Sequence, residues 1–174
     1  MIFDWAVFFK MMTMMQSFTL DWSNLCQLFA IIFITSNLCS VQFAVAHEVM
    51  HKPDKFYRIL ATLHMSKLYY MHFTYHHLYR HHYQVATPND PSTSLKGENV
   101  YEFVVRCIKY SWKGVYNDEQ KLGKPFLQNY ALLSILSSLV FAGLVYLVFG
   151  LQPMIVHSLV AFGSIFYLES INYI

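Results

Sequence analysis

The chain has 174 residues, 56% of them hydrophobic and 18% aromatic, with a mean hydropathy of +0.34. This length suits one domain, and the apolar content is high for a soluble protein, so the composition favours a membrane protein. The net charge is only +2, and 11 of the 12 Lys and Arg residues lie between Lys52 and Lys124, which argues against a diffuse basic surface for nucleic acid.

Residues 1–21 form the first apolar, Met-rich stretch, which Asp4, Lys10 and Asp21 interrupt. A signal peptide has a basic start and a small-residue cleavage site, and neither is clear in this stretch. We therefore predict an interfacial or truncated helix at the start of the chain.

Trp22 to Ala46 is a run of 25 residues without a charged side chain. As a helix, such a run is long enough to cross a hydrocarbon core of about 30 Å. No Gly or Pro separates it from His47, and Lys52-Pro53-Asp54 then ends the helix. We predict a first membrane span here, with His47 on its last turns at the membrane–water boundary.

Lys55 to Tyr83 is apolar at first and aromatic later, which predicts one helix that spans or re-enters the membrane. Its histidines are functional candidates, because ionisable side chains within a membrane are usually functional. Tyr and His near an interface also form aromatic belts, so both interpretations stay open. For His64 we favour a structural role, since no other histidine lies at metal-binding spacing from it.

Residues 85–99 are rich in Pro, Asn and Gly and predict a loop. Residues 98–124 predict an amphipathic interfacial helix, whose basic side chains favour the cytoplasmic side of a membrane. The apolar side of this helix comprises Val100, Phe103, Val104, Cys107, Ile108 and Trp112.

Among the 50 residues that follow Lys124, Glu169 is the only Asp, Glu, Lys or Arg. Two apolar segments, residues 126–149 and 151–174, meet at Gly150 and predict a helical hairpin through the bilayer. Taken together, these elements predict an all-α fold, an integral membrane helical bundle that crosses the bilayer several times.

Eight of the nine histidines lie between His47 and His82, in two clusters. On a helix a spacing of four advances about 400°, so His47 and His51 project from one face, as do His77 and His81. Neutral imidazole suits iron, zinc or copper. We therefore predict that the two histidine boxes converge on a metal centre at one membrane face.

Two observations bear on the kind of metal site. Cys26, Cys39 and Cys107 form no CxxC pair and are interpreted as packed thiols, which argues against zinc ribbons and iron–sulfur clusters. Glu48 stands where a zinc metalloprotease has its general base. Two clusters with five well-spaced histidines instead suggest more than one metal ion, and the second cluster has no role in a protease.

Three segments of the sequence together resemble one family. HEVMHK (His47 to Lys52) is similar to an HExxHK box, HLYRHH (His77 to His82) to an HxxxHH box, and VATPNDPSTSLKGENVYEF (Val85 to Phe103) to the segment behind the second box. These are features of the membrane-bound alkane 1-monooxygenase family, within the wider membrane fatty-acid desaturase and hydroxylase superfamily. The resemblance is firmest over residues 44–103 and extends from Trp22 to the end of the chain.

This resemblance implies a helical membrane protein with two irons that activate O₂ to hydroxylate the terminal methyl group of an alkane or alkyl chain. It also implies electrons from a rubredoxin-type partner, contact with membrane lipid, and no role for nucleic acid. By motif position, and with no catalytic residue beyond them, the iron ligands are His47, His51, His77, His81 and His82.

The chain departs from the family in two places. His76 stands where the family has a Glu, and we predict that it is a hydrogen-bonding partner of a ligand rather than a ligand, as we do for Glu48 and His72. The sequence also stops at the approach to the family's NYxEHYG segment, before a further RHxxHH box. We therefore expect residues 1–174 to be a single, partial domain that is not a competent hydroxylase alone and holds at most one metal weakly.

Two hypotheses of different classes follow. The first is a non-haem di-iron hydroxylase, or a fragment of one, with a lipid desaturase or an aromatic-methyl hydroxylase as its neighbouring alternative. The second is a catalytically inactive membrane protein that retains the helices and half of the iron site. An intramembrane zinc protease is a distant third.

Overall fold

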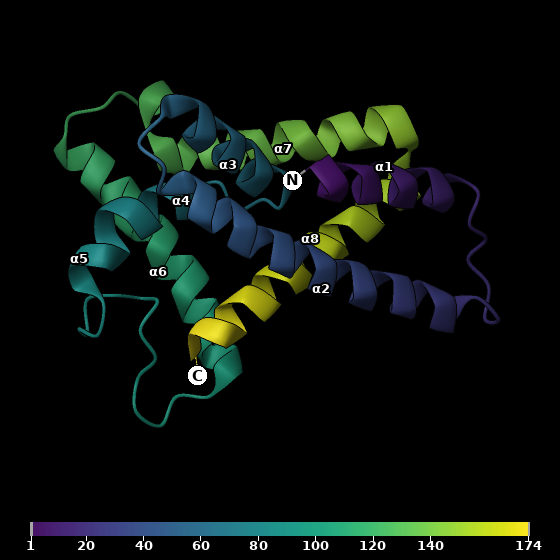
Figure 1. The fold of residues 1–174 in the computed structure, drawn as a ribbon, viewed down its shortest axis with the longest axis horizontal. Coiled ribbons are helices and arrows are strands. Elements are labelled where there is room, and N and C mark those ends of the chain that lie inside the picture. Colours follow the sequence, from purple (N-terminus) through teal and green to yellow (C-terminus); the bar gives the residue numbers. More distant parts are fainter. Residues whose placement is uncertain (1, 174) are drawn as a thin grey trace.

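The computed structural model describes residues 2–173, which form helices and no strand (Figure 1). The prediction of an all-α fold is confirmed, and Ile174 lies outside the described residues. The elements are α1 (Ile2–Gln16), α2 (Leu25–Met50), α3 (Lys55–Lys67), α4 (His72–His76), the π-helical turn η1 (His77–His81), α5 (His82–Gln84), α6 (Val100–Lys121), the 3-10 turn η2 (Phe126–Gln128), α7 (Tyr130–Phe149) and α8 (Leu151–Tyr173).

Within this part of the chain, α2, α7 and α8 are long and apolar enough to cross a membrane, as the sequence predicts. Their outward faces carry large exposed apolar side chains such as Phe29, Leu139 and Leu147, which suits a lipid surrounding. α8 crosses α2 closely, and the Ser36 hydroxyl donates to the Val160 carbonyl at 3.2 Å. Gly163 permits this approach, since a Cβ there would lie 2.5 Å from Ser36 Oγ.

Gly150 makes the sharp turn between α7 and α8 with φ +96° and ψ 179°, a conformation open almost only to glycine. We expect Gly150→Ala to destabilise the protein by about 1–3 kcal/mol, measured by thermal unfolding in detergent. Apart from the adjoining residues of the chain, no described atom lies within 4 Å of the added Cβ, so the cost comes from the backbone conformation alone. Gly143→Ala is the matched control, because Gly143 also has open space but lies inside α7; it should stabilise slightly. Equal effects of the two substitutions would contradict this account.

The prediction of a single helix over residues 55–83 is wrong. α3 ends at Lys67, the chain turns, and the next helix, α4, begins at His72. Tyr69 has φ 60°, which is unfavourable for a residue other than Gly or Asn. Tertiary contacts stabilise the turn: the Tyr70 hydroxyl donates to Glu169 at 2.9 Å, and the Tyr69 hydroxyl lies 3.2 Å from Ser158 Oγ. Both partners belong to α8, so the break depends on long-range packing.

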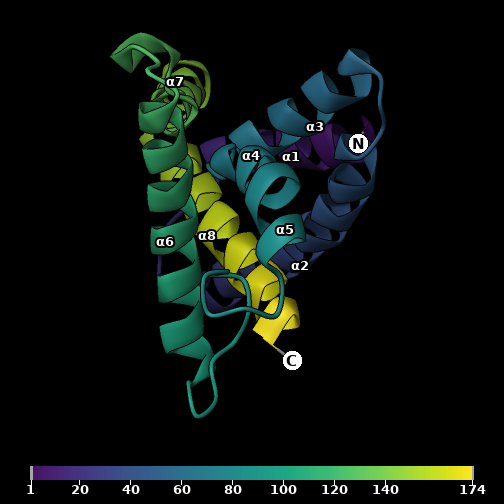
Figure 2. The same cartoon turned by 90° about the vertical axis from the view of Figure 1, so that its left-hand side faces the viewer.

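The second histidine box forms a π-helical turn, in which the His82 N–H donates to the His77 carbonyl. In such a turn each hydrogen bond joins residues five apart, so His77 and His82 face the same side. Figure 2 shows this segment, α4 with α5, between α6 and α2.

α6 begins with a capping box, in which Asn99 Oδ1 accepts from the backbone N–H of Glu102 and the Glu102 carboxylate accepts from the backbone N–H of Asn99. Its predicted apolar side is buried at Phe103 and Cys107. Of the three cysteines interpreted as packed thiols, Cys39 and Cys107 are buried, whereas Cys26 is exposed and corrects that prediction.

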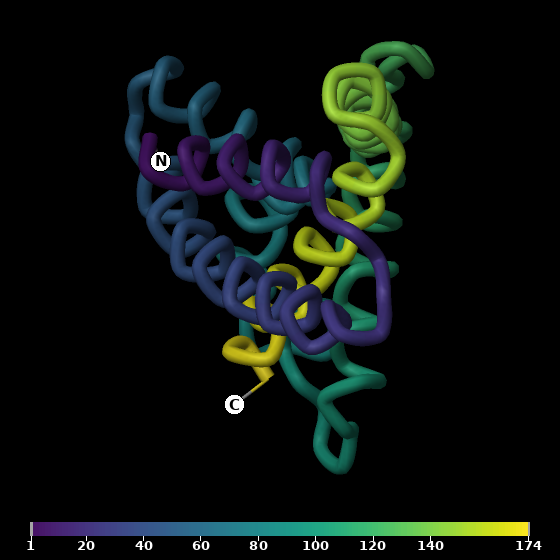
Figure 3. Tube along the Cα trace, turned by 90° about the vertical axis from the view of Figure 1, so that its right-hand side faces the viewer, coloured from purple at the N-terminus to yellow at the C-terminus, as the bar shows by residue number. Residues whose placement is uncertain are grey.

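α1 is more than an interfacial segment, because Phe8, Met12 and Met15 on it are buried in the core. In Figure 3 its purple trace lies above α2, with its N-terminal end near α3. Asp4 on α1 is also buried and forms an ion pair with Lys67 of α3.

Candidate metal centre

Four imidazoles meet at the C-terminal end of α2. His47 lies in the last turn of α2 and His51 follows it, whereas His77 and His82 come from the π-helical turn and its end. The Nε2 atom of His77 lies 2.6 Å from that of His47, 3.2 Å from that of His51 and 2.9 Å from that of His82. The Nε2 atoms of His47 and His51 are 3.3 Å apart.

These separations suit a shared cation. Two nitrogens bound at right angles to one metal ion, each at about 2.1 Å, lie about 3.0 Å apart. A neutral imidazole has one N–H and one lone pair, so His77 Nε2 cannot form hydrogen bonds with three other nitrogens at once. The donor set therefore fits a divalent transition-metal ion, and His47, His51 and His77 lie close enough together to hold one.

The protonation of His77 agrees with this fit. His77 is 9% exposed, and burial together with the neighbouring His47 and His82 lowers its pKa to about 2. Burial and His51 also lower the pKa of His82. Both rings are therefore neutral near pH 7, which is the form of imidazole that binds metals.

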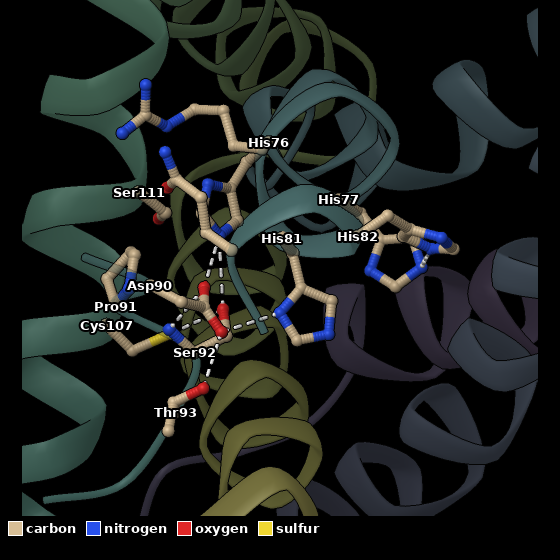
Figure 4. Close-up of polar contacts among 12 residues, drawn as sticks. His76, His77, His81, His82, Asp90, Pro91, Ser92, Thr93, Cys107 and Ser111 are labelled. Carbon is tan, nitrogen blue, oxygen red and sulfur yellow. Dashed lines mark hydrogen bonds and ion pairs between the residues drawn. The ribbon is translucent and has the colours of Figure 1, made fainter. Parts of the chain in front are cut away.

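His81 is next to this group but is held from the opposite side. Its ring stacks on that of His77 with centroids 5.2 Å apart, while its Nδ1 lies 2.9 Å from Asp90 Oδ2 (Figure 4). Burial raises the pKa of Asp90, but the hydrogen bonds that it accepts from His81, Thr93 and Ser92 outweigh burial. The net pKa of Asp90 is therefore below its ordinary value. Asp90 is thus a carboxylate.

The three residues predicted as hydrogen-bonding partners lie in different surroundings. Glu48 is largely exposed, and its Oε1 is 3.6 Å from His47 Nδ1. His76 is buried, with Nε2 3.1 Å from Ser92 Oγ and 3.8 Å from Asp90 Oδ1. His72 is buried as well, but its Nε2 lies 3.3 Å from Ser111 Oγ on α6.

Sequence reasoning missed two buried carboxylates near the histidines. The sequence around Asp90 predicts only a turn, and nothing in its local pattern indicates a partner on another element. Glu169 accepts from the Tyr70 hydroxyl at 2.9 Å and from Cys107 Sγ and Asn172 Nδ2 at 3.1 Å each. As a lone carboxylate in a long apolar stretch, Glu169 did carry a signal, because such groups are rare in membranes and need partners.

An apolar cavity of about 370 Å³ opens beside the cluster, between α2, the second box and α8. His47, His77 and His81 line it together with the polar side chains of Ser40, Ser92 and Asn172. Its walls include Val41, Ala44, Phe73, Leu168 and Ile171. A concave site with apolar walls and a few convergent polar groups is typical of small-molecule binding.

The three apolar helices and the imidazole cluster define a class, a helical membrane protein with a histidine-rich site at the end of one span. Residues 22–174 match the family model described as fatty acid desaturase. The chain therefore belongs to the fatty acid desaturase family, and within that superfamily to its alkane 1-monooxygenase branch, as the following relatives show. The resemblance predicted from the histidine boxes is confirmed.

An alkane 1-monooxygenase of Acinetobacter baylyi is 36% identical over 140 residues, which cover 74% of this chain and 33% of that protein. An alkane 1-monooxygenase of Pseudomonas putida is 39% identical over 79 residues, covering 45% and 20%. Alkane 1-monooxygenase 1 of Pseudomonas aeruginosa is 29% identical over 160 residues, covering 88% and 42%. The match thus spans less than half the length of each of these relatives.

Proposed function

We propose that this chain contributes to the O₂-dependent terminal hydroxylation of alkanes or alkyl chains at a non-haem di-iron site. The observation that carries the proposal is the convergence of four imidazole Nε2 atoms, two of which belong to His47 and His77 in the lining of an apolar cavity. The relatives named as alkane 1-monooxygenases support the same reaction.

In this proposal His47, His51, His77, His81 and His82 are the iron ligands. Iron, when bound, supplies the activation of O₂. The two boxes approach from different elements, so the fold brings the imidazoles together without requiring them to be close in sequence. The neutral state of His77 and His82 leaves their lone pairs available.

The apolar cavity would accommodate an alkyl chain. Leu168 and Ile171 of α8 and Val41 of α2 would exclude water from it, and the terminal methyl group would lie against His47 and His77 in the cavity lining. We further propose a rubredoxin-type electron donor and a cytoplasmic position for the histidine boxes. The cytoplasmic position agrees with the basic residues collected between Lys52 and Lys124.

The test exchanges the matched 140-residue segment of the Acinetobacter baylyi relative for the corresponding residues of this chain. We expect the chimera to convert a medium-chain alkane to the 1-alkanol with O₂, rubredoxin and a rubredoxin reductase. The same chimera with His47→Ala should lose this conversion, because His47 is a proposed iron ligand whose Nε2 lies 2.6 Å from that of His77. Conversion that is equal with and without His47 would overturn the proposal.

Metal analysis of the chimera and of the purified chain gives the second readout. Bound iron without alkanol formation would favour the alternative function, an inactive membrane protein that retains the histidine site. Conversion of a saturated acyl chain to an olefin without alkanol formation would favour a lipid desaturase.

A further inference from the structure

We propose that Asp90 is a positioning residue for His81, holding the imidazole proton on Nδ1 so that Nε2 keeps its lone pair for the metal. This inference rests on the proposed function, since it requires a metal at the histidine cluster. Its starting point is the 2.9 Å contact between His81 Nδ1 and Asp90 Oδ2, which joins the second box to the loop of residues 85–99.

The surroundings of Asp90 fix the direction of this hydrogen bond. Asp90 is 1% exposed, and both carboxylate oxygens already face donors. Oδ2 accepts from the Thr93 hydroxyl at 2.7 Å, and Oδ1 accepts from the backbone N–H of Ser92 at 3.1 Å. A carboxylate only accepts, so the proton between Asp90 and His81 belongs to His81 Nδ1. In a neutral ring, Nε2 is then the unprotonated nitrogen.

The position of the His81 ring makes Nε2 useful. Figure 4 shows the ring between the Asp90 carboxylate on one side and His77 with His82 on the other. Its centroid lies 5.2 Å from that of His77 and 6.0 Å from that of His82. His81 also lines the apolar cavity together with His47 and His77. The Nε2 atom of His81, opposite Asp90, is therefore on the side of the ring that faces the histidine cluster.

The loop that carries Asp90 is itself fixed to α6. The guanidinium of Arg106 donates to the Pro91 carbonyl at 3.1 Å and to the Thr93 carbonyl at 2.9 Å. It also forms a two-pronged ion pair with Glu98, at 2.6 and 2.8 Å. A histidine ligand whose outer nitrogen donates to a fixed carboxylate is held in one tautomer and one orientation, which is a common support of metal sites.

A plain structural role is the competing explanation, because Asp90 also closes its own turn through Ser92 and Thr93. Asp90→Asn separates the two roles. The backbone N–H of Ser92 is a fixed donor, so the amide oxygen of the new Asn side chain stays opposite it as the acceptor. The amide NH₂ then takes the place of Oδ2 and faces His81 and Thr93. The Thr93 hydroxyl can rotate to accept, but His81 must accept through Nδ1, which moves its proton to Nε2 and removes the lone pair.

The experiment titrates the purified full chain in detergent with Co²⁺, followed by visible absorption. We expect Asp90→Asn to weaken Co²⁺ binding by about 10–100-fold. Glu98→Gln is the matched control, because it loosens the loop through Arg106 without touching His81, and it should change the affinity by less than about threefold. In a His81→Ala background, Asp90→Asn should have no further effect, since Asp90 acts through His81.

A second measurement needs no substitution at Asp90. In ¹⁵N-histidine NMR of the metal-free chain, the signal that disappears in His81→Ala should show a protonated Nδ1 and an unprotonated Nε2. A protonated Nε2 would overturn the inference, as would Co²⁺ binding by the Asn variant equal to that of the unsubstituted chain, or additive effects in the double variant. Absence of Co²⁺ binding by the unsubstituted chain would overturn the proposed function as well, so the two failures are distinguishable.

Discussion

His77→Ala is expected to weaken metal binding by more than about 100-fold, beyond the loss typical of a partner that only supports a ligand. The reason is its place in the cluster: His77 Nε2 lies within 3.2 Å of the Nε2 atoms of His47, His51 and His82. Without His77, the cluster loses the one imidazole whose Nε2 lies near those of all three other histidines. The measurement is the Co²⁺ titration of the purified chain.

The control for this variant is His157→Ala. His157 is buried even more fully than His77, but it lies on α8, where its Nε2 donates to the Lys67 carbonyl at 2.9 Å and its ring contacts Phe8 and Phe141. Loss of His157 should lower stability and leave Co²⁺ affinity within about twofold. If His77→Ala and His157→Ala bind Co²⁺ alike, the cluster is not the metal site.

The two histidine boxes show how far spacing alone can predict a site. His47 and His51 are four apart at the C-terminal end of α2, and their Nε2 atoms lie 3.3 Å apart, which the shared helix face allows. The same rule pairs His77 with His81, whose rings do stack, but in the π-helical turn it is the Nε2 atom of His82 that lies 2.9 Å from that of His77. Spacing does not reveal a π-helical turn, because the chain adopts it only when the surrounding packing favours it.

Local sequence patterns could not predict the helix break after Lys67 or the role of Asp90, because both depend on contacts with distant parts of the chain. Tyr69 adopts a positive φ without Gly, and its stabilising partner, Ser158, is 89 residues away. Asp90 lies in a turn-forming segment, and its contact with His81 arises only when the loop folds back onto the second box. In contrast, the apolar spans were predictable, since length and absence of charge decide them within the sequence itself.

Asp4→Ala is expected to destabilise the protein by about 3–5 kcal/mol, because it leaves the Lys67 ammonium buried without its partner. Both side chains are 1% exposed, and the same carboxylate oxygen of Asp4 lies 3.2 Å from His64 Nδ1. Burial alone would raise the pKa of Asp4, but His64 and Lys67 lower it to about 2, so the carboxylate is charged near pH 7. The measurement is thermal or denaturant unfolding in detergent, followed by circular dichroism.

The double variant Asp4→Leu/Lys67→Met decides whether the lost stability comes from an unpaired charge or from lost packing. Replacing a buried ion pair with apolar side chains of similar volume is often neutral or stabilising, so the double variant should recover most of the stability that Asp4→Ala loses. The Lys67 ammonium also lies 5.2 Å from the Trp5 ring, so methionine, which keeps the apolar stem, preserves much of that contact. A double variant as unstable as Asp4→Ala would show that the pair itself, rather than avoidance of a lone charge, fixes α1 against α3.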